Sequence, residues 1–359
     1  MNAPFSLTTR ETVRAVDLGD PNEAARVEAC CAAHPEASPF HLPAWLQAVE
    51  QGTGNRAHAL VLERAGEIAA YLPLTEVHSP VFGRVLASTG FAVDGGVLAP
   101  NAQDASTLCA AAEELATRTA CASIELRGGP VSDDREGWAL QTDSHCGFVC
   151  DLAGDDEAQL TAIPRKQRAE VRKSLKLPLE VTTGSDERHR AAHYATYAQS
   201  VRNLGTPVFP RALFDAVLDR FGEAADILVV WHENAPLAAV LSLYHKGAVM
   251  PYWGGGTWDA RHLRGNERMY YALMCHARER GCTRFDFGRS KTGSGAYSFK
   301  KNWGFEPEPL TYAKWTAPGA EARDADPTSS KHARRIAIWQ RLPLPVANRL
   351  GPLIARGLG

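Results

Sequence analysis

The stretch that decides the fold runs from Asp226 to Gly256 and reads DILVVWHENAPLAAVLSLYHKGAVMPYWGGG. It holds three apolar segments, rich in β-branched and aromatic residues and separated by short breaks, which is typical of strands. We expect two strands paired around a turn at Asn234-Ala235, then a third strand over 248–256 that ends in three glycines. A segment of three consecutive strands predicts a sheet built largely from local pairings.

The elements around this stretch alternate in type. Residues 266–280 (NERMYYALMCHARER) predict a helix with Asn266 as its N-cap and Gly281 just past its end. The segment 283–290 (TRFDFGRS) follows as a strand, and helices are expected over 186–203 and 210–222 upstream. Strands that alternate with helices favour a mixed α/β or α+β sheet over a β-sandwich.

The first half of the chain shows the same order. A helix is expected over 40–51, strands over 57–64 and 68–77 around Ala65-Gly66, a helix over 102–119 and a strand over 122–129. The string ASIELRGG therefore parallels TRFDFGRS, each following a helix and ending beside glycine. At 359 residues the chain is also long for one core, so we predict two domains.

Composition narrows the class of protein. The net charge of −2 gives no global attraction to nucleic acid or anionic lipid. The N-terminal residues lack a signal-type apolar segment and no apolar run reaches bilayer length, so we expect a cytoplasmic location. The eight cysteines are scattered; His145, Cys146 and Cys150 lie close together without a second ligand pair. We predict neither a metal site nor a permanently bound cofactor.

Residues 163–176 (IPRKQRAEVRKSLK) predict a helix with a basic face. Arg165, Arg168, Arg172 and Lys176 fall on that face, and Glu170 is the one acid among six basic side chains. Guanidinium groups in such a cluster suit bidentate contacts with phosphate. The alternative is an ordinary solvated helix face.

Residues 286–305 (DFGRSKTGSGAYSFKKNWGF) carry the main catalytic candidates. The glycine-rich part does not match a phosphate loop. Instead, a strand carboxylate, Asp286, precedes a flexible loop with Arg289 and then a helix bearing Tyr297 and Lys300. We expect Asp286 to point away from its two phenylalanine neighbours and to share a cleft with Tyr297 and Lys300. A carboxylate that merely caps the loop is the alternative.

Two further segments could contact a ligand. The glycines after Tyr252 and Trp253 allow close approach of a ligand, so we expect Trp253, Gly254 and Gly255 to border a cleft. The turn before the helix at 266 carries further candidates for phosphate binding at a helix N-terminus, namely Arg261, Arg264, Gly265 and Asn266. An ordinary loop remains the alternative for both.

Four segments carry a family resemblance: PRKQRAEVRKSLK, YWGGGTWDARHLRGNERMYYALM, FDFGRSKTGSGAYSFKKNWGF and LPLPVANRLGPLIARGLG. They resemble the FemAB family of the GNAT-like acyltransferase superfamily, specifically proteins associated with the PEP-CTERM/exosortase system. The resemblance implies two tandem GNAT-like domains, each a mixed, splayed sheet flanked by helices. We expect an N-terminal extension over 1–37, domains over 38–150 and 151–317, and a linker with an amphipathic tail over 318–359.

The resemblance also implies a function. Fem enzymes move an aminoacyl group from tRNA to an amine on a lipid-linked cell-wall precursor, and Lys300 matches the lysine of their Phe-Lys pair. The long helical-hairpin insertion of some Fem proteins is missing, so acyl-CoA is an open alternative to aminoacyl-tRNA as co-substrate. The acceptor is expected to be an amine on an envelope or exopolysaccharide precursor. A small-molecule N-acetyltransferase and a catalytically inactive scaffold are the competing hypotheses.

Direct acyl transfer needs a base and a partner for the oxyanion. We assign the base to Asp286, the oxyanion contact to Lys300 or the Gly255 N–H, and leaving-group protonation to Tyr297 or Tyr252. The basic, apolar tail is expected either to pack on the domain or to contact the inner membrane surface.

Overall fold

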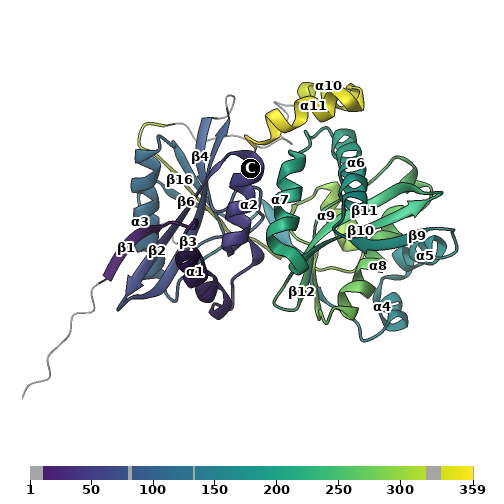
Figure 1. Ribbon diagram of the computed structural model, residues 1–359, viewed down its shortest axis with the longest axis horizontal. Coiled ribbons are helices and arrows are strands. Elements are labelled where there is room, and N and C mark those ends of the chain that lie inside the picture. The colour runs from purple at the N-terminus through teal and green to yellow at the C-terminus, as the bar shows by residue number, and fades with distance from the viewer. Residues whose placement is uncertain (1–10, 80–82, 132–133, 321–332, 359) are drawn as a thin grey trace, which may run out of the picture.

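The computed structural model describes residues 11–79, 83–131, 134–320 and 333–358. These residues form two adjacent α/β units, each with a sheet flanked by helices, and two further helices lie across the upper side of the molecule (Figure 1). The tandem mixed-sheet architecture expected from the sequence is confirmed.

The first sheet has seven strands in the order β1-β2-β3-β4-β5-β16-β6. Helix α3 packs against its central strands through an apolar core that includes Leu72, Leu108 and Ile124. The strands are β1 (Glu11–Val16), β2 (Arg56–Arg64), β3 (Glu67–Ser79), β4 (Gly83–Ala87), β5 (Ser123–Arg127), β16 (Tyr312–Thr316) and β6 (Trp138–Gln141). The helices are α1 (Pro21–Ala33), α2 (Pro43–Thr53) and α3 (Ala102–Arg118).

The second sheet has six strands in the order β8-β13-β12-β11-β10-β9, and a small sheet, β14-β7-β15, joins it to the first unit. Its strands are β8 (Val149–Asp151), β9 (Glu180–Gly184), β10 (Ala225–His232), β11 (Ala235–His245), β12 (Ala248–Gly256) and β13 (Arg284–Asp286). The small sheet comprises β7 (His145–Gly147), β14 (Ser290–Lys291) and β15 (Glu308–Pro309). The helices are α4 (Asp156–Ala162), α5 (Arg165–Ser174), α6 (Glu187–Leu204), α7 (Arg211–Phe221), α8 (Gly265–Glu279) and α9 (Gly295–Asn302).

Two-residue turns with positive φ connect the long hairpins. The Ala65-Gly66 turn lies where the sequence placed it, with φ of 53° and 88°. The turn expected at Asn234-Ala235 is wrong by one residue, because Glu233 and Asn234 adopt positive φ and Ala235 already begins β11. Two consecutive positive-φ residues match the twist of the flanking strands.

The second sheet opens beside β12. Strand β12 pairs with β13 in parallel at Ala248 and Val249, while its later residues continue to Gly256 along β11. The register with β11 shifts at Tyr252, a bulge that bends the strand. Beyond Val249, none of the described strands pairs with this edge of β12, so its backbone groups face the helices of the second unit.

One strand from the end of the second half of the chain joins the sheet of the first unit. The sequence placed the strand after the 295–302 helix in the second half, but β16 pairs with β5 and β6 in the first sheet. The assignment is wrong because Ala313 and Trp315 pack in the first unit's core beside Trp138. Alternation within a single strand does not reveal which sheet will receive it.

The N-terminal extension expected over 1–37 is also wrong for the residues that the structure describes. Strand β1 pairs along its whole length with β2. Helix α1 buries Val27 and Cys31 against the same sheet. Residues 11–37 therefore belong to the first unit.

A shared apolar core joins the units. Trp45 and Phe40 of the first unit pack among Phe214, Trp253 and their neighbours in the second. Helix α2 lies so close to α7 that a Cβ at Gly52 would stand 2.4 Å from Leu213 Cα. Close packing of this kind opposes free movement of one unit against the other.

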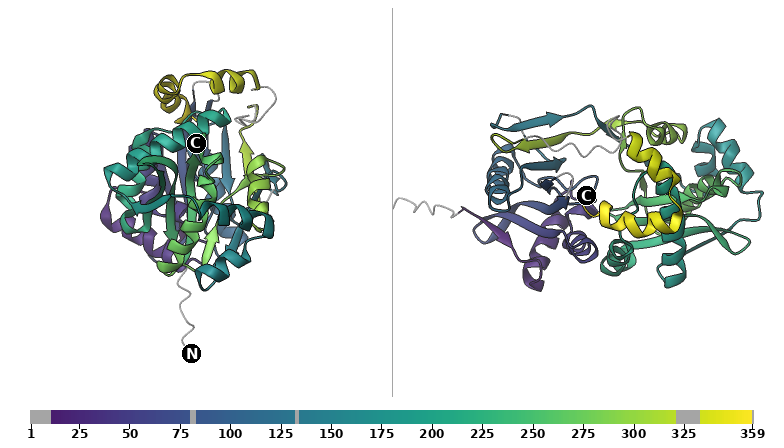
Figure 2. Two further views of the ribbon diagram at one scale, coloured as in Figure 1. Left: turned by 90° about the vertical axis from the view of Figure 1, so that its right-hand side faces the viewer. Right: turned by 90° about the horizontal axis from the view of Figure 1, so that it is seen from above.

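The expected linker over 318–331 lies largely outside the described residues. The tail beyond it forms α10 (Ala333–Arg341) and α11 (Leu344–Ala355), which pack on α6 (Figures 1 and 2). None of the described helices combines the length and the apolar content that a bilayer crossing requires.

Candidate functional site

Asp286 ends β13 where the sheet opens. Its neighbours Phe285 and Phe287 are buried in the core of the second unit, and Asp286 faces the opposite way, as strand alternation predicts. Its carboxylate accepts a hydrogen bond of 2.8 Å from the Gly288 N–H. Burial raises the pKa of Asp286 to about 6, and the negative charge of Asp94 acts in the same direction.

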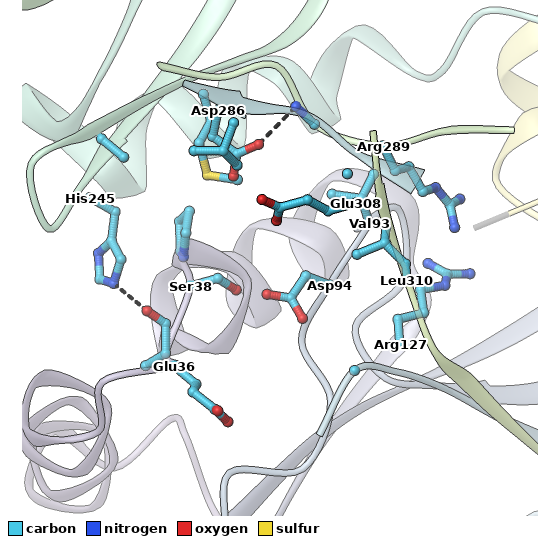
Figure 3. A pocket seen from close by; sticks show the side chains of 18 of the residues that line it. Glu36, Ser38, Val93, Asp94, Arg127, His245, Asp286, Arg289, Glu308 and Leu310 are labelled. Carbon is cyan, nitrogen blue, oxygen red and sulfur yellow. Dashed lines mark hydrogen bonds between the residues drawn. The ribbon is translucent and has the colours of Figure 1, made fainter. Parts of the chain in front are cut away.

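The Asp286 carboxylate borders a cavity of about 410 Å³ between the two units (Figure 3). The first unit contributes Glu36, Asp94 and Arg127, while the segment that leads to β16 contributes Glu308. Figure 3 shows Asp94 and Glu308 extending into the space below Asp286. The cavity therefore gathers carboxylates and arginines from segments far apart in the chain.

Glycines allow the loops of the first unit to reach this cavity. A Cβ at Gly96 would stand 1.9 Å from the Gly128 carbonyl oxygen, and one at Gly129 would stand 2.6 Å from Val97 N. Gly128, at φ +86°, lies directly under the Asp94 carboxylate, which a Cβ there would approach to 2.9 Å. Residues 94–96 (DGG) and 127–129 (RGG) are thus in direct backbone contact, and this contact fixes the position of Asp94.

Two arginines occupy the other wall of the cavity. Arg127 is buried, forms an ion pair of 3.0 Å with Glu125 and donates to the Thr89 and Ala92 carbonyls. Arg289 donates to the Tyr312 hydroxyl at 2.7 Å. Arg289 is also a candidate for binding phosphate of the donor. It lines this interdomain cavity, apart from the candidates Arg261 and Asn266, which line a second cavity.

Lys300 lies behind the loop that follows Asp286. Its ammonium group donates to the Gly288 and Arg289 carbonyls at 3.0 and 2.9 Å and lies over the rings of Phe148 and Phe287. Burial lowers the pKa of Lys300 to about 8. Lys300 is not among the residues that line these two cavities, but it bonds to Gly288 and Arg289, which line the cavity of Asp286, and its part in a shared cleft stays a prediction.

A second cavity, of about 420 Å³, follows the unpaired edge of β12. Gly254, Gly255 and Gly256 form one wall. The segment after β12 and helices α6, α8 and α9 form the others, the helices through residues that include Ser200, Asn266, Tyr270 and Phe299. A Cβ at Gly255 would stand 2.5 Å from Ser200 Cβ, so glycine lets α6 approach this strand. Gly254 and Gly255 therefore lie in a cavity wall, and their contact with a ligand stays a prediction.

The predicted phosphate-binding turn divides into two parts. Arg261 lines the second cavity beside Asn266 and stacks over the exposed Trp258 ring at 4.7 Å. Arg264 turns away, bonded through Nε to Glu170 of α5 at 2.5 Å. Gly265 is buried against Leu237. Helix α8 begins at Gly265 after Arg264, so Asn266 is not its N-cap as expected.

The three aromatic candidates, Tyr252, Trp253 and Tyr297, each pack against other aromatic rings. Tyr252 donates its hydroxyl to the Phe91 carbonyl across the domain boundary, and Trp253 packs against Trp45. Tyr297 packs edge-on against Phe148 at 5.5 Å. Neither of the two cavities includes these three side chains, and their parts in catalysis stay predictions.

The basic face of α5 forms as expected. Arg165, Arg168 and Arg172 border a surface hollow together with Lys173 and Lys176. Arg168 also donates to the Ile163 carbonyl at 3.0 Å, while Arg165 and Arg172 are exposed. This hollow is separate in its lining residues from both cavities beside β12. No group of three metal-binding side chains occurs within the described ranges.

Comparisons with known proteins agree with this geometry. Residues 164–301 match the family model described as Acetyltransferase (GNAT) domain. No curated protein matches the sequence at a significant level. The crystal structure of FemX is similar to this chain at a TM-score of 0.64 and 16% identity, over 81% of this chain and 95% of that one.

Two other solved structures share the fold. A tandem GNAT protein from the clavulanic acid biosynthesis pathway has a TM-score of 0.56 and 11% identity, over 87% of this chain and 100% of that one. The C-terminal domain of a putative lysylphosphatidylglycerol synthetase from Agrobacterium fabrum has a TM-score of 0.52 and 14% identity, over 81% and 91% of the two chains. The chain therefore has a tandem GNAT-like fold, and the family match falls within its second unit.

Proposed function

We propose that the second unit transfers an acyl group from acyl-CoA to an amine that enters from the interdomain cavity. The observation that carries this proposal is the position of Asp286, a carboxylate with a raised pKa of about 6 at the opening of the sheet. The match of residues 164–301 to an acetyltransferase domain supports the reaction class. A carboxylate with such a pKa is ionised at neutral pH and remains basic enough to accept a proton.

The second cavity is the proposed donor site. The unpaired edge of β12 offers the backbone N–H groups of alternate residues, and we assign the Gly254 N–H to the oxyanion of the donor carbonyl. The Gly255 N–H, expected in this part from the sequence, faces β11, since Thr257 two residues further on donates to the Leu237 carbonyl. Arg261 and Asn266, near the N-terminus of α8, are the proposed contacts for the phosphates of CoA. Arg264 and Gly265 keep an indirect part, since they hold the turn in place.

The proposed step is direct and leaves no acyl-enzyme. Asp286 lies on the interdomain side of β13, opposite the Phe287 ring that packs on Tyr270 of the donor cavity. The ammonium group of the acceptor therefore gives a proton to Asp286 in the interdomain cavity, and the freed amine passes the opening between β12 and β13 and attacks the thioester carbonyl. The new C–N bond forms, the C–S bond breaks, the sulfur takes a proton, and the nitrogen releases its second proton, which restores the group that protonated the sulfur. We assign the proton that the sulfur takes to Tyr270, whose hydroxyl lines the donor cavity and would stand 3.4 Å from a Cβ at Gly254. Burial raises the pKa of Tyr270 well above its usual value, which keeps its proton available.

The interdomain cavity suits an acceptor that carries both an amine and an anionic group. Glu36, Asp94 and Glu308 favour a cation, while Arg127 and Arg289 favour an anion. An amine on a cell-envelope or exopolysaccharide precursor fits this mixture, in line with the resemblance to the exosortase-associated FemAB proteins. A small amine as acceptor is the narrower alternative.

An aminoacyl-tRNA donor is the second candidate, and the arginine face of α5 is the observation that favours it. Phosphate contacts through Arg165, Arg168 and Arg172 release counterions, so tRNA binding through them must weaken steeply as salt rises. CoA bound in the β12 cavity depends on salt far less.

The test uses the full chain and two labelled donors. Purified protein is incubated with isotope-labelled acetyl-CoA or with charged tRNA and a panel of amino sugars, diamines and amino-acid amides, and the products are identified by mass spectrometry. We expect labelled amide from acetyl-CoA, and CoA should raise the melting temperature. Product from tRNA alone would favour the second candidate. Binding without transfer from either donor would leave the inactive scaffold as the better hypothesis.

A further inference from the structure

The C-terminal helix pair, α10 and α11, presents two faces of different character. The inner face of α11 buries Ala347 and Ala355, and Gly351 lies so close to Val208 that a Cβ there would stand 3.0 Å from its backbone nitrogen. On α10, Ile336 packs over Gly205. Small residues thus bring the pair close to the second unit.

The outer face is apolar and exposed. Ile338 is 64% exposed and Leu353 is 61% exposed, although a packed helix normally turns such side chains inward. They belong to a group of large apolar side chains without a covering partner among the described residues: Ile338, Val346, Leu350, Leu353 and Ile354. Contiguous apolar surface of this kind marks an interaction site.

The charge of the pair indicates the kind of partner. Residues 333–358 contain no aspartate or glutamate, while Arg341, Arg349 and Arg356 are exposed beside the apolar group. Exposed apolar side chains next to arginines, with no acidic side chain nearby, complement a surface that has an apolar interior and negatively charged outer groups. An anionic lipid bilayer has both properties.

The helix pair is attached to both units, so its orientation is fixed. Arg202 of α6 donates to the Gln340 carbonyl at 3.0 Å, and Asn55 of the first unit donates to the Arg356 carbonyl at 2.7 Å. Gln340 in turn donates to the carbonyl of Asn203, a residue that lines the β12 cavity. Its neighbour Leu204 is 69% exposed at the rim of that cavity and extends the apolar surface.

We propose that the outer face of α10 and α11 docks in the headgroup region of an anionic lipid bilayer, with both helices lying in the plane of the interface. The docked orientation places the rim of the β12 cavity beside the lipid surface. This proposal rests on exposure, charge and attachment and is independent of the reaction that the second unit performs.

Co-sedimentation with vesicles tests the proposal on the full chain. We expect binding to vesicles that contain phosphatidylglycerol, and weaker binding as salt screens the arginines. The double substitution Leu353→Ser/Ile354→Ser should weaken binding by at least about tenfold, since each removes an apolar contact with the interface. Arg349→Gln should weaken it about fivefold.

Leu140→Ser is the matched control, because Leu140 is a similarly apolar, partly exposed residue on β6 of the first unit. Thermal melts must show that each variant stays folded. The proposal is overturned if the wild type does not sediment with anionic vesicles, or if the double variant sediments like Leu140→Ser. Concentration-dependent dimers that the double variant abolishes, without lipid binding, would identify a second copy of the chain as the occupant.

Discussion

The indole ring of Trp45, in the first unit, stacks on that of Trp253, in the second, with ring centroids 5.6 Å apart and planes inclined by 22°. Both rings are buried, and Trp253 lies on the strand whose glycine edge borders the proposed donor site. The contact therefore couples the packing of the domain boundary to the position of β12.

Trp45→Ala should destabilise the protein by about 3–5 kcal/mol, because it leaves a large cavity in the shared core. Chemical denaturation followed by fluorescence and by circular dichroism should show one transition at lower denaturant for both probes. Trp258→Ala serves as the control, since that indole is 56% exposed and should cost little. Two separate transitions in the wild type would contradict a shared core.

Asp286→Asn should lower kcat by roughly 10²–10⁴-fold while the fold persists, the usual contribution of a general base. In the wild type, kcat/KM should rise with pH through about 6 as the carboxylate ionises. Asp151→Asn, an exposed change on the neighbouring strand β8, is the control and should leave the profile unchanged. Full activity in Asp286→Asn would exclude this residue as the base.

Asp286→Asn, which should lower activity, should raise the stability of the fold at neutral and alkaline pH. The pKa of Asp286 is about 6 in the folded protein and about 4 in an unfolded chain, so folding favours the protonated form. Because ionisation of this carboxyl group disfavours the folded state, the free energy of unfolding of the wild type should fall as pH rises from about 4 to 6. Asp286→Asn should be more stable than the wild type by about 1–3 kcal/mol at pH 8, with little difference at pH 4. Equal melting temperatures at pH 8 would indicate a well-solvated carboxylate.

Lys300→Met should shift the pH profile upward. The positive charge of Lys300 lowers the pKa of Asp286, so its removal raises the pH at which the base ionises. The substitution also leaves the Gly288 and Arg289 carbonyls without their ammonium donor. Lys300→Arg keeps the charge and should restore the lower midpoint; a lower rate with an unshifted profile would mean that Lys300 acts only through the loop.

Gly96→Ala should destabilise the first unit by more than about 2 kcal/mol, because the added methyl group meets a backbone carbonyl that has no room to move. The displaced loop carries Asp94, so acceptor KM should rise as well. Gly154→Ala is the matched control, since nothing lies within 4 Å of a Cβ at that position. Unchanged melting temperatures for both variants would contradict the close contact between the two glycine strings.

The sequence alone predicted the part of the site that is local in the chain. Alternation around Asp286 gave its direction, and the run of glycines after Trp253 gave the unpaired edge of β12. Periodicity also located α6 and α7 to within a residue or two. These features depend on neighbours within one element, which is why pattern analysis finds them.

The other half of the site comes from distant segments. Asp94 reaches the cavity from a loop of the first unit, Arg127 from the end of β5, and Glu308 from the segment before β16. The available signal was the string Asp94-Gly95-Gly96 together with the glycines that end the predicted strand over 122–129. Nothing in either string alone indicates that the two lie in contact. The position of Lys300 behind the loop 287–290 could not be predicted, because it depends on how that loop folds.

The pairing of β16 with β5 and β6 of the first unit also has a consequence for biosynthesis. Strand β16 lies between β5 and β6 in the sheet, so neither strand can complete its pairing until β16 has been made. Strand β16 lies nearly 190 residues after β5 in the chain. At 5–20 residues per second, a ribosome needs roughly 10–40 s to make that stretch. The N-terminal half of the nascent chain therefore cannot reach its finished form ahead of the C-terminal half, and both mature together late in translation.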